Sequence, residues 1–169
     1  MKFLHTTFAT WFGLGLSPVA PGTMGSIGTL PFLALVLYLF PQFPVWALAG
    51  VQINAFLPLS ILIFFVAIPS VNWIIRYKKI KDPQLVVIDE VAGQTLAFAF
   101  VAPELLRQHW WLGLLGLVAF RIFDITKPLG IHKLESLPGA WGVMADDMLG
   151  GLYAGGVLCV IAHLLVIPA

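Results

Sequence analysis

Charged side chains are scarce in this sequence. Only 10% of its 169 residues are Asp, Glu, Lys or Arg, whereas soluble domains carry about 25%. Hydrophobic residues make up 60% of the chain, no charged residue occurs between Phe3 and Ile75, and none follows Asp147. Such a chain lacks the polar surface that a water-soluble fold requires. We therefore predict one membrane-embedded domain, residues 1–169, folded in the bilayer as a compact all-α, multi-pass transmembrane helical bundle.

Other features are also missing. The net charge is only +1, so the surface has no excess of positive charge and no nucleic-acid partner is expected. Cys159 is the one cysteine, which excludes a disulfide within the chain. Lys2 is a lone basic residue, and polar residues and glycines interrupt the stretch after it, so no cleavable signal peptide is expected. The sequence leaves the oligomeric state open.

Five stretches are apolar enough to form about five membrane-embedded helices. A helix that spans a bilayer needs about 20 apolar residues, within a range of about 17–25. The third and fourth stretches, 91–106 and 110–123, are short, so we expect these helices to be tilted within the bundle or only partly inserted. Residues 45–55, before the second stretch, are expected to be interfacial or a helical extension. In chain order, the predicted helices cover Met24–Phe40, Phe56–Ile75, Val91–Leu106, Trp110–Phe123 and Met148–Ile167.

The lysines and arginines predict the orientation in the membrane. With five spans, the amino terminus and the loops at 76–90 and 121–147 share one side. Every Lys and Arg except Arg107 falls on that side, and so does every acid except Glu104. By the positive-inside rule, this side faces the cytoplasm.

Three segments that are far apart in the sequence bring carboxylates to this side. They read "VIDEVAGQ" at 87–94, "FRIFDITKP" at 120–128 and "ADDMLGG" at 145–151, and each begins or ends a predicted helix. Gathered carboxylates repel one another, and a divalent cation such as Mg²⁺, Ca²⁺ or Mn²⁺ would remove the repulsion. The alternative is a hydrated acidic rim without a function. The five candidate ligands are Asp89, Glu90, Asp124, Asp146 and Asp147.

Small residues follow the acids at helical spacing. Asp89 and Gly93 are four residues apart, and Asp147, Gly151 and Gly155 are spaced at the same interval. This is the small-xxx-small pattern of closely packed membrane helices. We expect such packing to hold carboxylates of different helices near one another.

Two further features could bind an anion beside the acids. Arg121, Asp124 and Lys127 would share one helical face, where they either pair with each other or combine an acid that holds a cation with bases that hold a phosphate. The glycine-rich segment 13–31, which includes Thr23 and Ser26, could offer backbone N–H groups to an anion. Its glycines could equally serve helix packing.

Four segments together resemble the phosphatidylglycerophosphatase A family. They are "LSPVAPGTMGSIG", "VVIDEVAGQ", "FRIFDITKP" and "WGVMADDMLGGLYAG", and the resemblance covers about residues 10–160. Gly130 departs from the family pattern, because many members have proline there, and only the local turn is affected. The resemblance implies a magnesium-dependent phosphatase of the bacterial inner membrane, active in phospholipid biosynthesis. Its substrate would be phosphatidylglycerophosphate, from which it would release phosphate and leave phosphatidylglycerol.

The resemblance also implies roles for particular residues. The acids would hold Mg²⁺ and supply a base or a nucleophile, and the bases would stabilise the phosphate. The competing hypotheses are a small membrane transporter and a non-catalytic membrane scaffold with a metal-binding acidic cluster. A transporter would need polar groups in mid-span, where only Gln52, Asn54 and Gln94 are candidates. The predicted catalytic and metal-binding residues are Asp89, Glu90, Asp124, Asp146 and Asp147, and the predicted phosphate-binding residues are Arg121, Lys127, Thr23 and Ser26.

Overall fold

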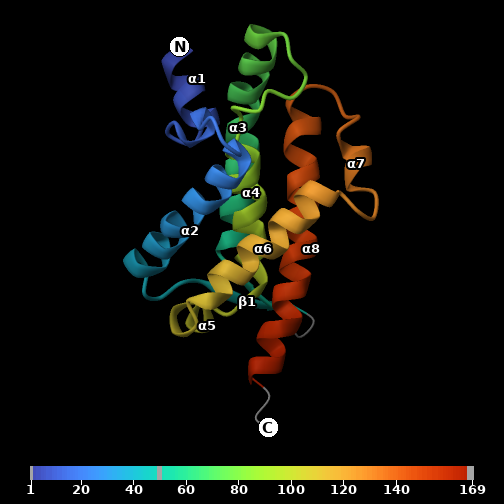
Figure 1. The fold of residues 1–169 in the computed structure, drawn as a ribbon. Coiled ribbons are helices and arrows are strands. Elements are labelled where there is room, and N and C mark those ends of the chain that lie inside the picture. Colours follow the sequence, from blue (N-terminus) through green and yellow to red (C-terminus); the bar gives the residue numbers. More distant parts are fainter. Residues whose placement is uncertain (1, 49–50, 167–169) are drawn as a thin grey trace.

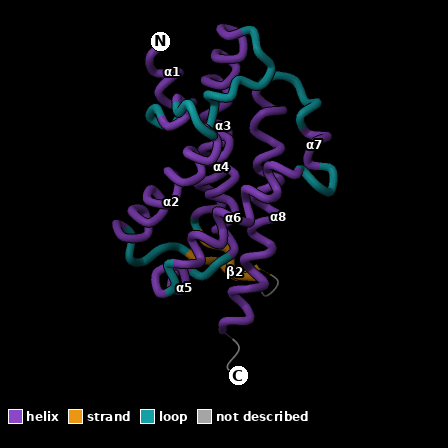
Figure 2. Tube along the Cα trace, viewed as in Figure 1, coloured by secondary structure: helices purple, strands orange, loops and turns teal. Residues whose placement is uncertain are grey.

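Helices make up most of the protein (Figures 1 and 2). The computed structural model describes residues 2–48 and 51–166, and within them lie eight α-helices, two short 3₁₀ helices and one pair of strands. The prediction of a mainly α-helical membrane protein is confirmed, whereas strands were not expected. In chain order the elements are α1 (Lys2–Ala9), η1 (Leu14–Leu16), α2 (Pro21–Leu39), β1 (Val45–Leu48), β2 (Val51–Asn54), α3 (Phe56–Lys78), α4 (Ile88–Ala97), η2 (Phe98–Phe100), α5 (Pro103–Gln108), α6 (Trp111–Thr126), α7 (Ile131–Leu134) and α8 (Ala140–Val166).

Three of these helices, α2, α3 and α8, are long and apolar enough to cross a membrane. Helices α4 and α6 have 10 and 16 residues, fewer than the roughly 17 that a full span requires. The described part of the chain therefore has three candidate spans rather than the five embedded helices that were predicted. The two short helices pack against the long ones and complete the bundle (Figure 1). Ile167, the last residue of the predicted fifth helix, lies outside the described residues.

Helix α4 differs most from its prediction. The single helix expected at Val91–Leu106 is wrong, because this stretch is divided among α4, η2 and α5. Ala102 has an extended backbone, as is usual for the residue before a proline, here Pro103. Every residue of α4 except Glu90 is buried, since α2, α3, α6 and α8 all contact this helix. The short α4 is thus the centre of the bundle.

Val45–Leu48 and Val51–Asn54 are paired strands, so the prediction of a helical extension at 45–55 is wrong. Strands β1 and β2 pair antiparallel at the end of the molecule opposite α1 (Figure 2), and residues 49 and 50 between them lie outside the described residues. The buried Asn54 side chain donates hydrogen bonds to the carbonyls of Phe98 and Val101, both at 2.8 Å. Asn54 therefore ties the strand pair to the turn that ends α4 and serves packing instead of lining a transport path.

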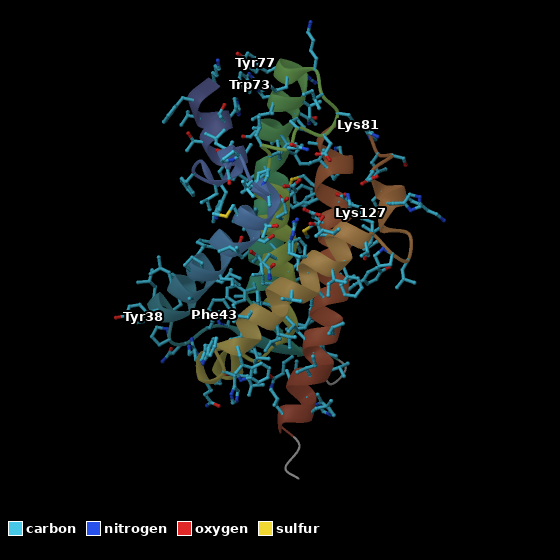
Figure 3. The ribbon with its side chains drawn as sticks, in the orientation of Figure 1. Tyr38, Phe43, Trp73, Tyr77, Lys81 and Lys127 are labelled. Atoms are coloured by element: carbon cyan, nitrogen blue, oxygen red, sulfur yellow. The ribbon has the colours of Figure 1, made fainter. Side chains whose placement is uncertain are left out.

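The segments predicted to share one side of the membrane lie at one end of the molecule. The amino terminus, the loop after α3 and the start of α8 are together there (Figure 1). Lys81 and Tyr77 are found at this end, whereas Tyr38 and Phe43 lie toward the other (Figure 3). The chain thus concentrates its charged residues at one end, as the distribution of Lys and Arg predicts, with Glu104 and Arg107 of α5 as the exceptions.

Glycines bring α4 and α8 into direct backbone contact. The two helices run in the same direction (Figure 1). A Cβ atom on Gly151 would lie 2.1 Å from the Gly93 carbonyl oxygen, and one on Gly93 would lie 2.4 Å from the Asp147 carbonyl oxygen. The predicted close packing is confirmed. Because Asp89 and Asp147 each precede one of these glycines by one helical turn, the same contact brings the two acids together.

Candidate active site

A polar cavity of about 510 Å³ lies at the charged end, where the beginning of α2, the beginning of α4, the end of α6 and the second turn of α8 meet. It contains all five predicted acids and both predicted bases. The three sequence segments are therefore brought to one place, as expected. The residues that line the cavity are Pro18, Ala20, Pro21, Gly22, Asp82, Gln84, Val86, Asp89, Glu90, Arg121, Asp124, Ile125, Lys127, Val143, Asp146 and Asp147.

The tightest group of acids is Asp89, Glu90 and Asp147. Each offers one carboxylate oxygen, and these oxygens lie within 4.8 Å of one another. Asp89 and Glu90 are in the first turn of α4, and the glycine contact places Asp147 of α8 opposite them. A single divalent cation with oxygen ligands at about 2.0–2.6 Å can bridge oxygens at this separation.

Unpaired oxygen atoms support the same assignment. Among the described side chains, Glu90 Oε2 and Asp146 Oδ1 are buried and have no hydrogen-bond partner. Burial raises the pKa of Asp89, and the nearby charge of Glu90 raises it further. Burial also raises the pKa of Glu90, although a hydrogen bond with Asp89 acts in the opposite direction. Buried acids with free oxygens and raised pKa values suit a cation that replaces their protons, so these residues fit a hard divalent metal.

Arg121 and Asp124 come from the last two turns of α6. The Arg121 guanidinium contacts the Asp124 carboxylate, and its Nη1 lies 3.7 Å from Glu90 Oε1. The pairing of Arg121 with Asp124 on one helical face follows the prediction. Arg121 also reaches across to α4, and its buried Nε has no hydrogen-bond partner within the described chain. That N–H is a donor available to an anion in the cavity.

Lys127 pairs with Asp146 and with a second acid, Glu135. Its Nζ lies 2.6 Å from Asp146 Oδ2 and also contacts the Glu135 carboxylate. Burial disfavours its charge, but the hydrogen bonds that Lys127 donates to Asp146 and Glu135 outweigh this effect and raise the pKa of Lys127. Lys127 therefore stays protonated, and it pairs with Asp146, which is not in the group of Asp89, Glu90 and Asp147.

Two acids at the site were not predicted from the sequence. Asp82 is an exposed residue in the loop before α4 that lines the cavity. Glu135 accepts the second hydrogen bond of Lys127, and this contact lowers the pKa of Glu135. Both lie outside the four quoted segments. Their only signal in the sequence is that they fall on the charged side of the membrane.

The glycine-rich segment meets the cavity at residues other than those predicted. Neither Thr23 nor Ser26 is among the lining residues, and the buried Ser26 hydroxyl donates to the Gly22 carbonyl of its own helix at 3.1 Å. The geometry therefore gives no support to phosphate binding by these two side chains. The segment lines the cavity with Pro18, Ala20, Pro21 and Gly22. Gly22 is in close contact with the charged groups, because a Cβ there would lie 2.1 Å from Glu90 Oε1 and 3.1 Å from Arg121 Nη1.

The chain is similar to known proteins along most of its length. The model of the family described as phosphatidylglycerophosphatase A matches residues 7–162. A Bacteroides thetaiotaomicron protein named "Putative phosphatidylinositol-3-phosphatase" is 36% identical over 154 residues, which cover 90% of each chain. The phosphatidylglycerophosphatase A of Escherichia coli K12 is 29% identical over 92% of this chain and 81% of its own length. The protein of the same name from Haemophilus influenzae is 34% identical over 86% of this chain and 81% of its own. No solved structure matches.

Proposed function

Because the chain belongs to the phosphatidylglycerophosphatase A family of lipid phosphatases, we propose that its substrate is phosphatidylglycerophosphate. The products are phosphatidylglycerol and inorganic phosphate, Mg²⁺ is the cofactor, and the reaction takes place on the cytoplasmic face of the bacterial inner membrane. The observation that carries the proposal is the grouping of Asp89, Glu90 and Asp147 within 4.8 Å beside two partly buried bases, Arg121 and Lys127. This site opens at the charged end of a membrane-embedded bundle, where lipid phosphates lie.

Residues of the cavity have separate roles in the proposed reaction. Asp89, Glu90 and Asp147 hold the metal, which when bound polarises the phosphoryl oxygens and stabilises the leaving group. Arg121 donates its free Nε–H to a non-bridging phosphate oxygen and so stabilises the charge that develops there. Its contacts with Glu90 and Asp124 keep the guanidinium in place.

We assign the proton-accepting role to Asp146. One of its oxygens is bound to Lys127 at 2.6 Å, which stabilises the ionised form, while the other oxygen is buried and unpaired within the described chain. When it is ionised, a carboxylate that lines the cavity and has one oxygen without a hydrogen-bond partner can accept a proton from an attacking water. Asp124 neighbours Asp147 and Arg121 and helps to position both.

A second candidate substrate is phosphatidylinositol 3-phosphate. The relative with 36% identity carries a name that refers to this activity, and the two lipids share the chemistry that the site recognises, a phosphate monoester at the bilayer surface. The residues of the described cavity act on that monoester and do not themselves select one headgroup over the other. We favour phosphatidylglycerophosphate because the family model and two of the relatives bear its name.

The experiment is phosphate release by the purified protein in detergent micelles that contain either lipid, with Mg²⁺ or with a chelator. The proposal predicts release from phosphatidylglycerophosphate at a kcat/KM at least about tenfold above that for phosphatidylinositol 3-phosphate, and no release with chelator. The reverse preference would establish the second candidate. A wild-type protein that binds Mg²⁺ but releases phosphate from neither lipid would refute both and favour the scaffold or transporter.

A further inference from the structure

An apolar cavity of about 310 Å³ lies between the second half of α2 and the first half of α6. Leu30, Leu33 and Leu37 line it from α2, and Gly113 lines it from α6. The ring of Phe98 forms part of its inner wall. No charged residue is among the side chains around this cavity, so its occupant must be apolar.

The same two helices connect this cavity with the acidic site. The first turn of α2, at Gly22, and the last turns of α6, at Arg121, line the polar cavity, and both helices run obliquely from there (Figure 1). Leu30 is eight residues from Gly22, and Gly113 is eight residues from Arg121, about 12 Å along each axis at 1.5 Å per residue. One leaflet of the hydrocarbon core is about 15 Å deep, half of about 30 Å. A chain attached to a headgroup in the polar cavity therefore reaches the apolar one.

Gly113 leaves space in the cavity because it has no side chain. A Cβ atom at Gly113 would meet no described atom within 4 Å, whereas one at Gly116, a turn later, would lie 2.4 Å from the Phe98 ring. Gly116 is thus required by packing inside the protein, and Gly113 is not. Since glycine within a helix costs about 1 kcal/mol relative to alanine, space left at Gly113 indicates an occupant from outside the chain.

Arg107 contacts the end of α2 next to this cavity. Its Nη2 donates to the carbonyls of Leu37, Phe40 and Pro41, each at 3.1 Å. These carbonyls belong to the last turn of α2 and to the two residues after it, where helical hydrogen bonds run out, so Arg107 ties α5 to the end of α2. This contact and the polar site therefore lie at opposite ends of α2.

We propose that the groove between α2 and α6 holds one acyl chain of the lipid substrate while its phosphate lies in the acidic site. This inference rests on the proposed function. The cavity is lined by α2 and α6, the two helices that also line the acidic site, so an occupant attached to the bound headgroup is favoured over a helix from a second copy. A single hydrocarbon chain is thinner, is apolar along its length, and is already attached to the headgroup.

The test compares Gly113→Phe with Gly156→Phe. Gly156 is also a helical glycine whose Cβ would meet no described atom within 4 Å, but it lies on α8, away from the groove. Phosphate release is measured in micelles with dioleoyl and with dihexanoyl phosphatidylglycerophosphate, because the short chains end before the groove. Gly113→Phe should lower kcat/KM for the dioleoyl lipid at least about tenfold, the loss expected when as few as two methylene groups are displaced. The dihexanoyl lipid and both activities of Gly156→Phe should change less than about twofold.

Equal losses on both lipids, or no loss on either, would overturn the acyl-chain proposal. If Gly113→Phe does not fold, as judged by its thermal unfolding, Gly113→Leu enters the same comparison with the same expected ratio. The proposed function is judged separately by the wild type. If the wild type hydrolyses both lipids and the variants do not discriminate between the dioleoyl and the dihexanoyl lipid, the acyl-chain proposal fails and the proposed phosphatase activity stands.

Discussion

The contact between Gly93 and Gly151 should control catalysis although neither residue has a functional side chain. In Gly151→Ala the new Cβ would lie 2.1 Å from the Gly93 carbonyl oxygen. To restore an ordinary contact of 3.4 Å, α4 and α8 must separate by about 1.3 Å. Asp147 moves with α8 and Asp89 and Glu90 move with α4, so the acid group opens by a similar amount. A displacement of about 1 Å in a catalytic site costs about 100-fold in rate.

The assay is kcat/KM for phosphate release, together with a titration of activity with Mg²⁺. Gly151→Ala should lose about 100-fold in kcat/KM and need more Mg²⁺ for half-maximal activity, because its ligands are farther apart. Gly156→Ala is the matched control: it adds the same methyl group to the same helix, where that group meets no described atom within 4 Å. If Gly151→Ala matched Gly156→Ala in activity and in Mg²⁺ requirement, the glycine contact would not set the geometry of the site.

Three further predictions concern the metal, its protons and the core. Asp147→Asn should lower kcat for phosphate release at least about 100-fold. The control Glu104→Gln, which changes an exposed acid at the far end, should leave kcat unchanged. Near-normal activity of Asp147→Asn would show that Asp147 is not a metal ligand. Because burial raises the pKa of Asp89 and of Glu90, protons compete with Mg²⁺ up to a higher pH than for ordinary carboxylates. The Mg²⁺ concentration for half-maximal activity should therefore rise as the pH falls from 8 toward 5, and a constant value would contradict the shift. Asn54→Leu removes two hydrogen bonds to buried carbonyls and should destabilise the fold by about 2–4 kcal/mol, whereas the exposed Gln52→Leu should not; thermal unfolding in detergent compares them.

The gathering of the acids could be predicted from the sequence because it follows from simple rules. Charged residues avoid the hydrocarbon region, so segments that are far apart in the chain are forced into one layer. Glycines at four-residue intervals after Asp89 and Asp147 indicate where two helices touch. These two rules together predict the neighbourhood of the acids without any knowledge of the loops.

The limits of helix α4 could not be predicted in the same way. Hydropathy shows that residues 91–106 are apolar, but an apolar stretch can be a span or a short helix buried among others. The choice depends on the hydrogen bonds of Asn54, which come from a strand more than 40 residues away in the sequence. Contacts of that kind leave no periodic signal.

The partners of individual charges were also beyond the sequence. The spacing of Arg121, Asp124 and Lys127 predicts a shared face, yet Lys127 ends α6 in a left-handed conformation. It turns instead toward Asp146 and Glu135. Where Glu135 lies depends on the path of residues 128–139, which spacing along a helix does not describe. Contact of Gly22 with the site was not predicted, because a residue without a side chain carries no functional group that a sequence motif could reveal.

Helix α8 both carries Asp146 and Asp147 and continues as a candidate membrane span. From Met148 to Leu165 it extends about 27 Å at 1.5 Å per residue, close to the thickness of an ordinary hydrocarbon core. The height of the acids above the bilayer centre is thus set by the length of this one apolar segment. Hydrophobic mismatch would shift that height: a thicker bilayer draws the acids below the plane of the phosphates, and a thinner one raises them above it. Lipid composition therefore acts on this enzyme mechanically, through membrane thickness, as well as chemically, through the supply of substrate.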